Sequence, residues 1–372
     1  MTTITKILGG AQILLGISYD VQDCFEQYLT AEQRTFLATL RLLGQYQPAI
    51  ERAGAATGRP AYENEPFLRA FLAKSFFRIP STEDLRNRLI ADPNLRLICG
   101  FTEVPSAATF SRRLAMLSKK AVPTRMLNGL GVDFYKDRIV GHISRDSTAI
   151  DAREAPVNKK RDVAPRLKRK RGRPRKGEQR PERKRSRIEQ QLRMKPGKAV
   201  AELDRACSWG CKTNSQGNVT FWKGYKLHLD VTDQGIPVTA VVTGANVHDS
   251  QAAIPMEKWT ERKLDFLYSV MDSAYDAGPI LGYIQGKGRV PLIDPNKRRG
   301  SERRTFTPAQ RERFQVRTTV ERANSHLKDW LLPPQIFVRG ILKVSFMLMC
   351  GALLLAALKV LQAIAPPLSA AA

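Results

Sequence analysis

Cysteine and histidine are scarce in this sequence, and their scarcity excludes the common structural metal and disulfide sites. The 372 residues contain five cysteines and four histidines. Cys207 and Cys211 are four positions apart, but no second pair of ligands with zinc-binding spacing accompanies them. An odd number of scattered cysteines does not form a disulfide framework, so we expect reduced thiols in a cytoplasmic protein.

Long apolar runs are also missing. The strongest run, Val344–Leu358, has 15 residues before Lys359 interrupts it, whereas a membrane-spanning helix needs about 18 or more. The N-terminal TKILGGAQILLGI has a basic residue and a short apolar run, but it lacks a cleavage site of the secretory type. We therefore expect neither export nor a membrane role. We interpret Val344–Leu358 as a buried helix that ends before Pro366 and Pro367.

Acidic residues are too few to balance the basic ones. Asp and Glu number 35 against 61 Lys and Arg, which gives a formal charge of +26 and a pI near 10.2. Solubility does not require so large a charge, so it indicates a polyanionic partner, nucleic acid before a membrane surface. Because 42% of the residues are hydrophobic, the chain can still bury the core of one large domain or two.

The basic residues are concentrated in one segment, Lys159–Lys198, which we call the arm. It contains 19 Lys or Arg and four acids, so its net charge of +15 is more than half of that of the whole chain. With so few apolar residues the arm cannot pack a core. We predict that it is disordered in the absence of a partner.

Within the arm, the run KRKRGRPRKG resembles an AT-hook, in which a Gly-Arg-Pro core lies extended in the narrow minor groove of A·T-rich DNA. The residues expected to contact DNA there are Lys170, Arg171, Arg173 and Arg175. The alternative is a basic linker that contacts phosphates without regard to sequence. The Gly-Arg-Pro core favours the minor-groove interpretation.

Residues 1–135 are predicted to form a helical N-terminal domain. Thr30 and Gln33 have the spacing of a capping box ahead of an apolar helical pattern. The segment VPSAATFSRRLAML has the character of the second helix of a helix-turn-helix, with Arg112 and Arg113 exposed for DNA. A plain amphipathic helix packed on the bundle is an equally good interpretation.

Beyond Arg138 the sequence becomes strand-like. IVGHIS is rich in β-branched residues and leads into Asp146, which we expect at or just after the end of a central strand. FLYSVM is an apolar run that ends at Asp272, as expected of a buried parallel strand with an acid at its carboxyl end. Between them, two alternating segments around a DQG turn predict a hairpin that begins near Phe221. Asp146 alone could also be a turn residue that ends the strand, which is common.

The stretch Phe314–Trp330 contains no Gly or Pro and is predicted to form one helix. Arg317, Glu321 and Lys328 follow one another at spacings of four and seven, so they share a face of that helix. The face presents one carboxylate flanked by two cations. Taken alone, this pattern is also typical of a surface helix with a stripe of salt bridges.

With Phe314 ahead of it, this face resembles the Tyr-Arg-Glu-Lys signature of DDE transposases of the IS4 type. The segments RDSTAI, GYKLHLDV, HDSQ and MDSAYDA and the order of strands and helices add to the similarity. The resemblance implies an α/β catalytic domain over residues 136–345, with an RNase H-like mixed sheet flanked by helices. The basic insertion then occupies about 155–200, and 346–372 form an apolar helix and tail.

The resemblance also implies a chemistry. Asp146, Asp272 and Glu321 are expected to hold two Mg²⁺ or Mn²⁺ ions, which carboxylate oxygens suit, and Arg317 and Lys328 to bind phosphates. The implied function is that of an insertion-sequence transposase, active as a homodimer on double-stranded DNA. The alternatives are a non-catalytic DNA-binding descendant of such an enzyme and an RNase H-like nuclease without strand transfer.

Two departures from the family pattern bear on the mechanism. Phe314 lacks the hydroxyl of the family's Tyr, and we expect its ring to pack the helix against the core. Only about 20 residues separate Asp294 from Phe314, so the large β-rich insertion of some relatives is missing. Cleavage through a hairpin intermediate, which that insertion assists, is therefore not implied here.

Overall fold

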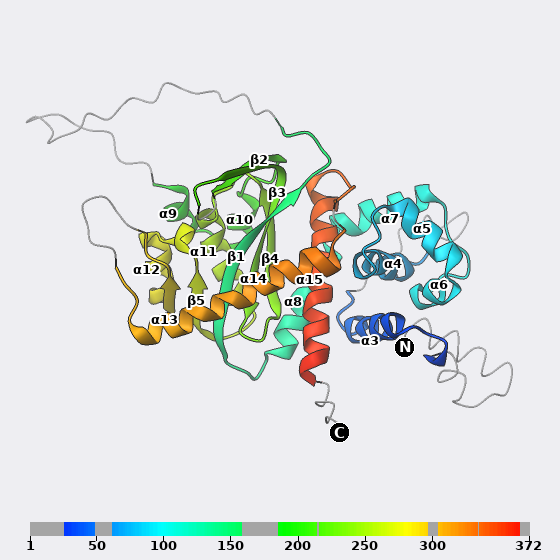
Figure 1. The fold of residues 1–372 in the computed structure, drawn as a ribbon, viewed down its shortest axis with the longest axis horizontal. Coiled ribbons are helices and arrows are strands. Elements are labelled where there is room, and N and C mark those ends of the chain that lie inside the picture. Colours follow the sequence, from blue (N-terminus) through cyan, green and yellow to red (C-terminus); the bar gives the residue numbers. More distant parts are fainter. Residues whose placement is uncertain are drawn as a thin grey trace, which may run out of the picture.

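The computed structural model describes residues 26–48, 62–157, 185–213, 216–296, 304–333 and 335–364. It contains a bundle of short helices, a mixed sheet and one long helix between them (Figure 1). The helices that precede the sheet are α3 (Ala31–Gly44), α4 (Glu65–Phe76), α5 (Thr82–Ala91), α6 (Pro93–Cys99), α7 (Ala107–Lys119) and α8 (Val122–Phe134).

Capping and aromatic packing account for the helical bundle. The predicted capping box is confirmed, because the Thr30 hydroxyl accepts from the Gln33 amide and the Gln33 side chain accepts from the Thr30 amide, both at 3.1 Å. The rings of Phe67 on α4 and Phe110 on α7 lie 5.0 Å apart, edge to face. These contacts bury the apolar side of α7 and leave its polar side at the surface.

Within the described residues the sheet has six strands: β1 (Val140–Asp151), β2 (Ser208–Thr213), β3 (Val219–Thr232), β4 (Pro237–Gly244), β5 (Phe266–Met271) and β6 (Val290–Ile293). β3 pairs antiparallel with β1, β2 and β4. β5 lies between β1 and β6 and is parallel to both. A helical region followed by a mixed sheet with flanking helices confirms the predicted fold class, and the topology is compatible with an RNase H-like fold.

The strand β2 was missed by the sequence analysis. The predicted hairpin is confirmed as β3 and β4, but β3 begins at Val219 and its first half pairs with β2. Trp209 is exposed and Gly210 lies in the middle of β2. The segment therefore lacks the alternation of buried apolar residues by which a strand is recognised in a sequence.

Helices cover both faces of the sheet. Arg145 on β1 donates to the Ala253 carbonyl of α11 (Ser250–Thr260) at 2.9 Å, whereas the Ser144 hydroxyl donates to the Val316 carbonyl at 3.1 Å. Successive side chains of a strand point to opposite faces. The helical stretch that contains Val316 and α11 therefore lie on opposite faces, and α12 (Gly278–Gly286) packs beside α11.

The helix α15 (Ile341–Ile364) joins the bundle to the sheet. It packs against α4, α7, α8 and β4, and 14 of its residues are buried, which confirms the predicted buried helix. By length and composition α15 could cross a membrane, but 72% of its most apolar window is buried inside the protein. It is therefore packed as a core helix. The prolines expected to end it lie outside the described residues.

The end of the arm is folded, so the prediction of disorder is wrong for this part. It forms α9 (Arg187–Gln191) and α10 (Pro196–Ala201), which pack against α11. The ammonium group of Lys258 on α11 donates to the carbonyls of Gln191 and Met194 at 2.9 and 2.6 Å. Hydrogen bonds to backbone carbonyls thus anchor a segment that is poor in apolar residues. Such hydrogen bonds cannot be inferred from composition. Residues 158–184 lie outside the described residues.

The stretch predicted as one helix, Phe314–Trp330, changes its hydrogen-bonding pattern twice. The helix α13 (Pro308–Phe314) passes into a 3₁₀ turn, Gln315–Arg317, then into α14 (Thr318–His326) and a π-helical turn, Leu327–Leu331. A single α-helix is therefore wrong. Because a π turn is wider than an α turn, the lysine in this turn is displaced from the position that α-helical spacing predicts.

Candidate active site

Asp146 and Asp272 lie side by side at the sheet, and we call this pair the acidic site. β1 and β5 are paired in parallel up to Arg145 and Met271, and the two aspartates directly follow that pair. The expected position of Asp272 is confirmed, since β5 ends at Met271. The prediction that the first strand ends at Asp146 is wrong. β1 continues to Asp151 because β3 remains paired along its other edge.

A buried ion network fixes the strand that carries Asp146. Arg145 is fully buried and donates to both carboxylate oxygens of Asp230, at 2.6 and 2.8 Å, and to Glu257 at 3.1 Å. Removing one partner from a buried ion pair typically costs about 3–5 kcal/mol. Because Arg145 and Asp146 are neighbours on β1, this network holds the backbone from which the Asp146 carboxylate projects to the other face.

Burial is the main influence on both carboxyl groups of the acidic site. It raises the pKa of Asp146 from 3.8 to about 6, while the backbone N–H of Ser147 and the charge of Arg317 oppose the shift. Burial also raises the pKa of Asp272, against the charge of Arg317 and the Ala274 N–H, which donates to it at 3.0 Å. Two partly desolvated carboxyl groups side by side favour a nearby cation.

Glu321 lies on the helix α14 that crosses this face, but it is engaged with Arg317. The two side chains share a face, as predicted, and they form an ion pair, with Arg317 Nη1 at 2.6 Å from Glu321 Oε1. The Glu321 side chain is 48% exposed. In the described part of the chain, no three Asp, Glu, His or Cys side chains converge in a way that could hold a metal ion. Arg317 is thus a cation that interacts with Glu321 and with the acidic site.

Asn324 and Lys212 belong to the same region, and neither was predicted from the sequence. The side-chain amide of Asn324 donates to Asp146 Oδ2 at 3.2 Å. Asn324 follows Glu321 by three residues on α14, so helical spacing could have identified it. The charge of Lys212 on β2 lowers the pKa of Asp146 and of Asp272. Since β2 was not predicted, no signal in the sequence linked Lys212 to the site.

Lys328 brings another cation to this side of the sheet. Burial lowers its pKa, and the charge of Lys212 lowers it further, whereas the carboxylates of Asp151 and Asp146 oppose the shift. Lys328 also lines a surface pocket with Asp151. The structure therefore gathers Asp146, Asp272, Arg317 and Lys328 in one region, with Glu321 bound to Arg317 beside them.

Phe314 does not pack in the core as predicted. It is half-buried, and its ring centroid lies 5.1 Å from that of Phe306 in the preceding segment. The helix α13, of which Phe314 is the last residue, buries none of its residues. Without a core beneath α13, the ring covers a neighbouring aromatic side chain instead.

The other residues predicted to contact DNA lie elsewhere. Arg112 is exposed on α7 and donates to the Thr109 hydroxyl at 3.3 Å. Arg113 donates to the Asn64 side chain at 2.7 Å and lies over the ring of Phe67, so it takes part in packing the bundle. Four residues of the AT-hook-like run lie outside the described residues: Lys170, Arg171, Arg173 and Arg175.

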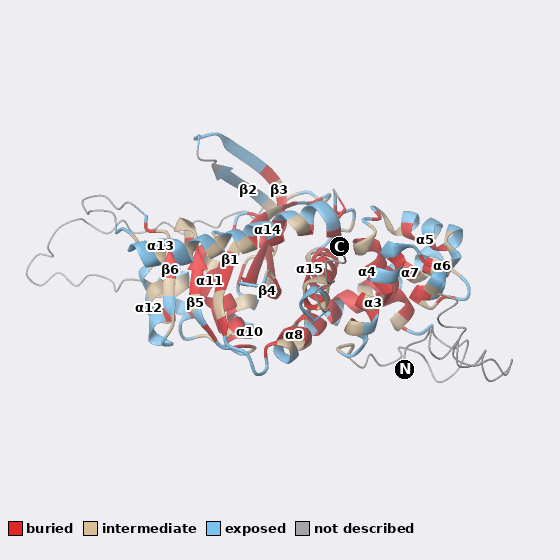
Figure 2. Cartoon of the chain, turned by 60° about the horizontal axis from the view of Figure 1, so that its bottom comes forward, coloured by how far each residue is buried: buried red, intermediate tan, exposed pale blue. Residues whose placement is uncertain are grey.

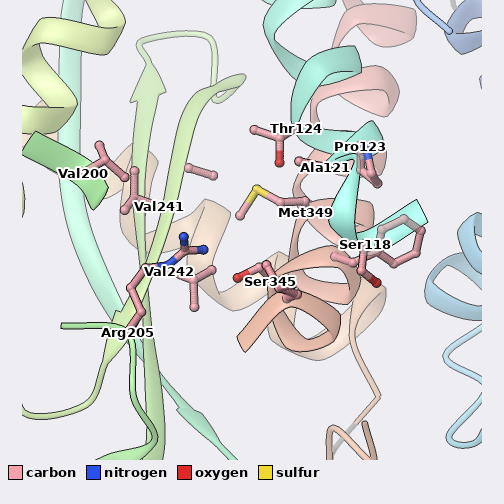
Figure 3. A pocket seen from close by; sticks show the side chains of 13 residues that line it. Ser118, Ala121, Pro123, Thr124, Val200, Arg205, Val241, Val242, Ser345 and Met349 are labelled. Carbon is pink, nitrogen blue, oxygen red and sulfur yellow. The ribbon is translucent and has the colours of Figure 1, made fainter. Parts of the chain in front are cut away.

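A cavity of about 180 Å³ lies between α8, α15, α10 and β4 (Figure 3). Its lining is mostly apolar, and no residue of the acidic site contributes to it. Two buried polar atoms at this cavity, Arg205 Nε and Ser345 Oγ, have no hydrogen-bond partner in the part of the chain that the structure describes. The cavity lies between β4 and the helices α8 and α15, and it is not the place of the carboxylate chemistry.

Comparison with known families matches two parts of the chain. The family described as Transposase DDE domain matches residues 143–355, which include both aspartates of the acidic site and Glu321. The family described as Transposase domain (DUF772) matches residues 28–115, from the start of α3 into α7. No curated protein and no solved structure gave a significant match.

Proposed function

The chain belongs to the family of transposases with a DDE domain, and on this premise we propose that it cleaves DNA at the ends of an insertion sequence and joins them to a new site. The observation that supports the proposal best is the adjacency of Asp146 and Asp272, on the face that α14 crosses with Arg317 and Glu321. In this assignment Asp146, Asp272 and Glu321 are the catalytic carboxylates. A DNA substrate and reduced thiols support a cytoplasmic location, which we propose for this protein.

The donors of the acidic site fit a divalent metal ion in part. Two adjacent carboxyl groups whose pKa values are raised by burial would be stabilised by a bound cation, and their oxygens suit Mg²⁺ or Mn²⁺. Glu321 would have to leave its ion pair with Arg317 to join them. A pair of such ions supplies activation of water and stabilisation of the leaving oxygen of a phosphodiester.

Arg317 and Lys328 are the residues that we assign to phosphate binding. A phosphate that approaches the acidic site meets both cations, and the planar guanidinium of Arg317 can bind two of its oxygens at once. The phosphate then competes with Glu321 for Arg317. DNA binding and the release of Glu321 therefore favour each other. Because an element has two ends, we propose that a homodimer is the active form.

The test is excision of a DNA segment that carries the gene with its native flanks, in the presence of Mg²⁺ or Mn²⁺. Asp146→Asn, Asp272→Asn and Glu321→Gln are each expected to abolish excision while DNA affinity changes little, because groups that act as a unit fail together. The control is Glu312→Gln, which removes an exposed carboxylate from the same helical stretch and should remain active.

Three outcomes would change the assignment. If one of these three carboxylate variants cuts DNA at the wild-type rate, the residue that it replaces is not catalytic. DNA binding by the wild-type chain without any cleavage in either metal favours the non-catalytic DNA-binding protein. Cleaved ends that are never joined to a target favour the nuclease without strand transfer.

A further inference from the structure

The strand β2 and the first part of β3 form a two-stranded ribbon that projects beyond the sheet (Figure 2). The pairing of β3 with β1 ends at Gly224 and its pairing with β4 ends at Tyr225. In the described part of the chain, residues 219–222 therefore pair with β2 alone, and the Lys223 carbonyl also accepts a hydrogen bond from the Ala152 N–H at 2.9 Å. We call residues 208–213 and 219–223 the ribbon. An isolated two-stranded hairpin is only marginally stable, so the ribbon needs an additional contact to keep its shape.

One face of the ribbon is packed, and this packing supplies that contact. Trp222 lies opposite Gly210, where an added Cβ atom would come within 2.4 Å of the Trp222 ring. The Trp222 side chain is buried, and its Nε1 donates to the carbonyl of Tyr225 at 3.1 Å. The close approach of a ring to a glycine stiffens the ribbon and connects it firmly to the rest of β3.

The opposite face of the ribbon presents apolar side chains to solvent. Because side chains alternate along a strand, Trp209 and Cys211 share this face with Val219 and Phe221. The exposed fractions are 60% for Trp209, 67% for Phe221 and 51% for Val219. A cluster of large apolar side chains exposed on one rigid element marks a binding surface.

The charge of the ribbon indicates what binds there. Its described residues include Lys212 and Lys223 and no acid. The ribbon continues β3, which pairs with the strand β1 that carries Asp146, and the charge of Lys212 lowers the pKa of both aspartates of the acidic site. Lys223 pairs with Trp209 and lies on the exposed apolar face, whereas Lys212 pairs with Thr220 and lies on the face of Trp222. In a two-fold contact between two copies of the chain through the apolar face, Lys223 would therefore approach its own copy and repel it. Nucleic acid instead offers phosphates to the lysines and base faces to the aromatic rings.

We propose that the ribbon binds the DNA that lies across the acidic site, with Trp209 and Phe221 stacked on bases and with Lys212 and Lys223 on phosphates. The proposal rests on the proposed function, because it takes the acidic site as the place where DNA is cut. A fully paired duplex keeps its base faces covered by stacking. The ribbon therefore favours DNA in which bases next to the cut are unpaired.

Binding in EDTA to two labelled duplexes, one fully paired and one with a short unpaired bubble, tests this proposal. The wild-type chain is expected to bind the bubble more tightly. Trp209→Ala combined with Phe221→Ala should weaken binding to the bubble by about 30-fold or more and remove the preference, as loss of base–aromatic stacking on two rings predicts. The salt dependence should stay the same, because no charge is lost.

The lysines give a second readout that stacking does not affect. Lys212→Ala combined with Lys223→Ala should reduce the slope of log affinity against log salt by about 2 on both duplexes, since two phosphate contacts disappear.

The matched control for the two ring substitutions is Ile139→Ala, which removes an apolar side chain that is 73% exposed outside the ribbon. Trp209→Phe combined with Phe221→Tyr keeps both rings and should bind as the wild type does, which separates lost stacking from lost folding.

Two results would overturn the proposal. One is a variant without the two rings that binds both duplexes as the wild type does. The other is a variant that loses self-association while each chain keeps its DNA affinity, because the ribbon would then be a contact between copies. The assay measures DNA binding without metal. If the ribbon does not bind DNA as proposed, the assignment of cleavage to the acidic site is unaffected. If the chain does not cleave DNA, the binding result still decides whether the ribbon contacts DNA.

Discussion

Replacing Asp146 by Asn is expected to stabilise the metal-free protein near neutral pH. Burial raises the pKa of Asp146 from 3.8 to about 6, so the folded chain holds this carboxylate in its ionised form at a cost. Asn carries no charge, and its side-chain oxygen can still accept the hydrogen bond that Asn324 donates to Asp146. The substitution therefore removes the cost while the local packing is kept.

The magnitude follows from the two pKa values. At about 1.4 kcal/mol for each pH unit, the interval from 3.8 to about 6 corresponds to about 3 kcal/mol as an upper limit. Because the pKa is raised in the folded state, the stabilising contribution of the protonated group is complete below about pH 4. It is lost as the pH rises through about 6. Asp146→Asn should thus be as stable as the wild type near pH 4 and more stable above pH 6.

Urea unfolding in EDTA across this pH range measures the difference. Asp137→Asn, a change to an exposed carboxylate, is the control and should shift the free energy of unfolding by less than about 0.5 kcal/mol. Added Mn²⁺ should stabilise the wild type more than Asp146→Asn, because a ligand that binds only the folded chain raises its stability. A variant that is no more stable than the wild type at pH 7.5, or that keeps the wild-type pH dependence, would refute the reasoning.

Three further predictions concern DNA binding. Phe314→Tyr should alter DNA affinity by less than tenfold, because the ring covers Phe306; a tenfold tightening in a titration would show that a hydroxyl reaches DNA. Deleting residues 160–183, which leaves α9 and α10 in place, should flatten the salt dependence of binding, and an unchanged slope would contradict the role of the arm. Arg171→Ala combined with Arg173→Ala should weaken binding to A·T-rich duplexes more than to G·C-rich ones, with Lys at both positions as the charge-preserving control. Equal losses on both duplexes would reduce the AT-hook-like run to a basic linker.

Features that depend on nearest neighbours in the chain were predictable from the sequence. The capping box at Thr30, the strand that ends before Asp272, the shared helix face of Arg317 and Glu321 and the burial of α15 all agree with the structure. In each case a backbone hydrogen bond, or the burial of one face, repeats at the spacing of a helix or a strand. Such a repeat is visible in a single sequence.

Several features that were not predicted depend on partners that are far apart in the chain. The length of β1 beyond Asp146 depends on its pairing with β3, and the folded end of the arm depends on Lys258. The strand β2 exists because its backbone pairs with β3 and because Gly210 admits the ring of Trp222. None of these contacts produces a periodic pattern within its own segment, so none could be inferred from that segment.

The sequence by itself determined which residue types are present for this chemistry: two aspartates after strand-like runs, a helix with alternating charges and a strongly basic arm. Only the tertiary structure decided that the aspartates are neighbours, that burial raises their pKa values, and that Glu321 is bound to Arg317. Strand register sets which distant residues meet, and burial sets how strongly their charges interact. Both are properties of the packed chain, so they arise only when the sheet and the helix α14 are assembled.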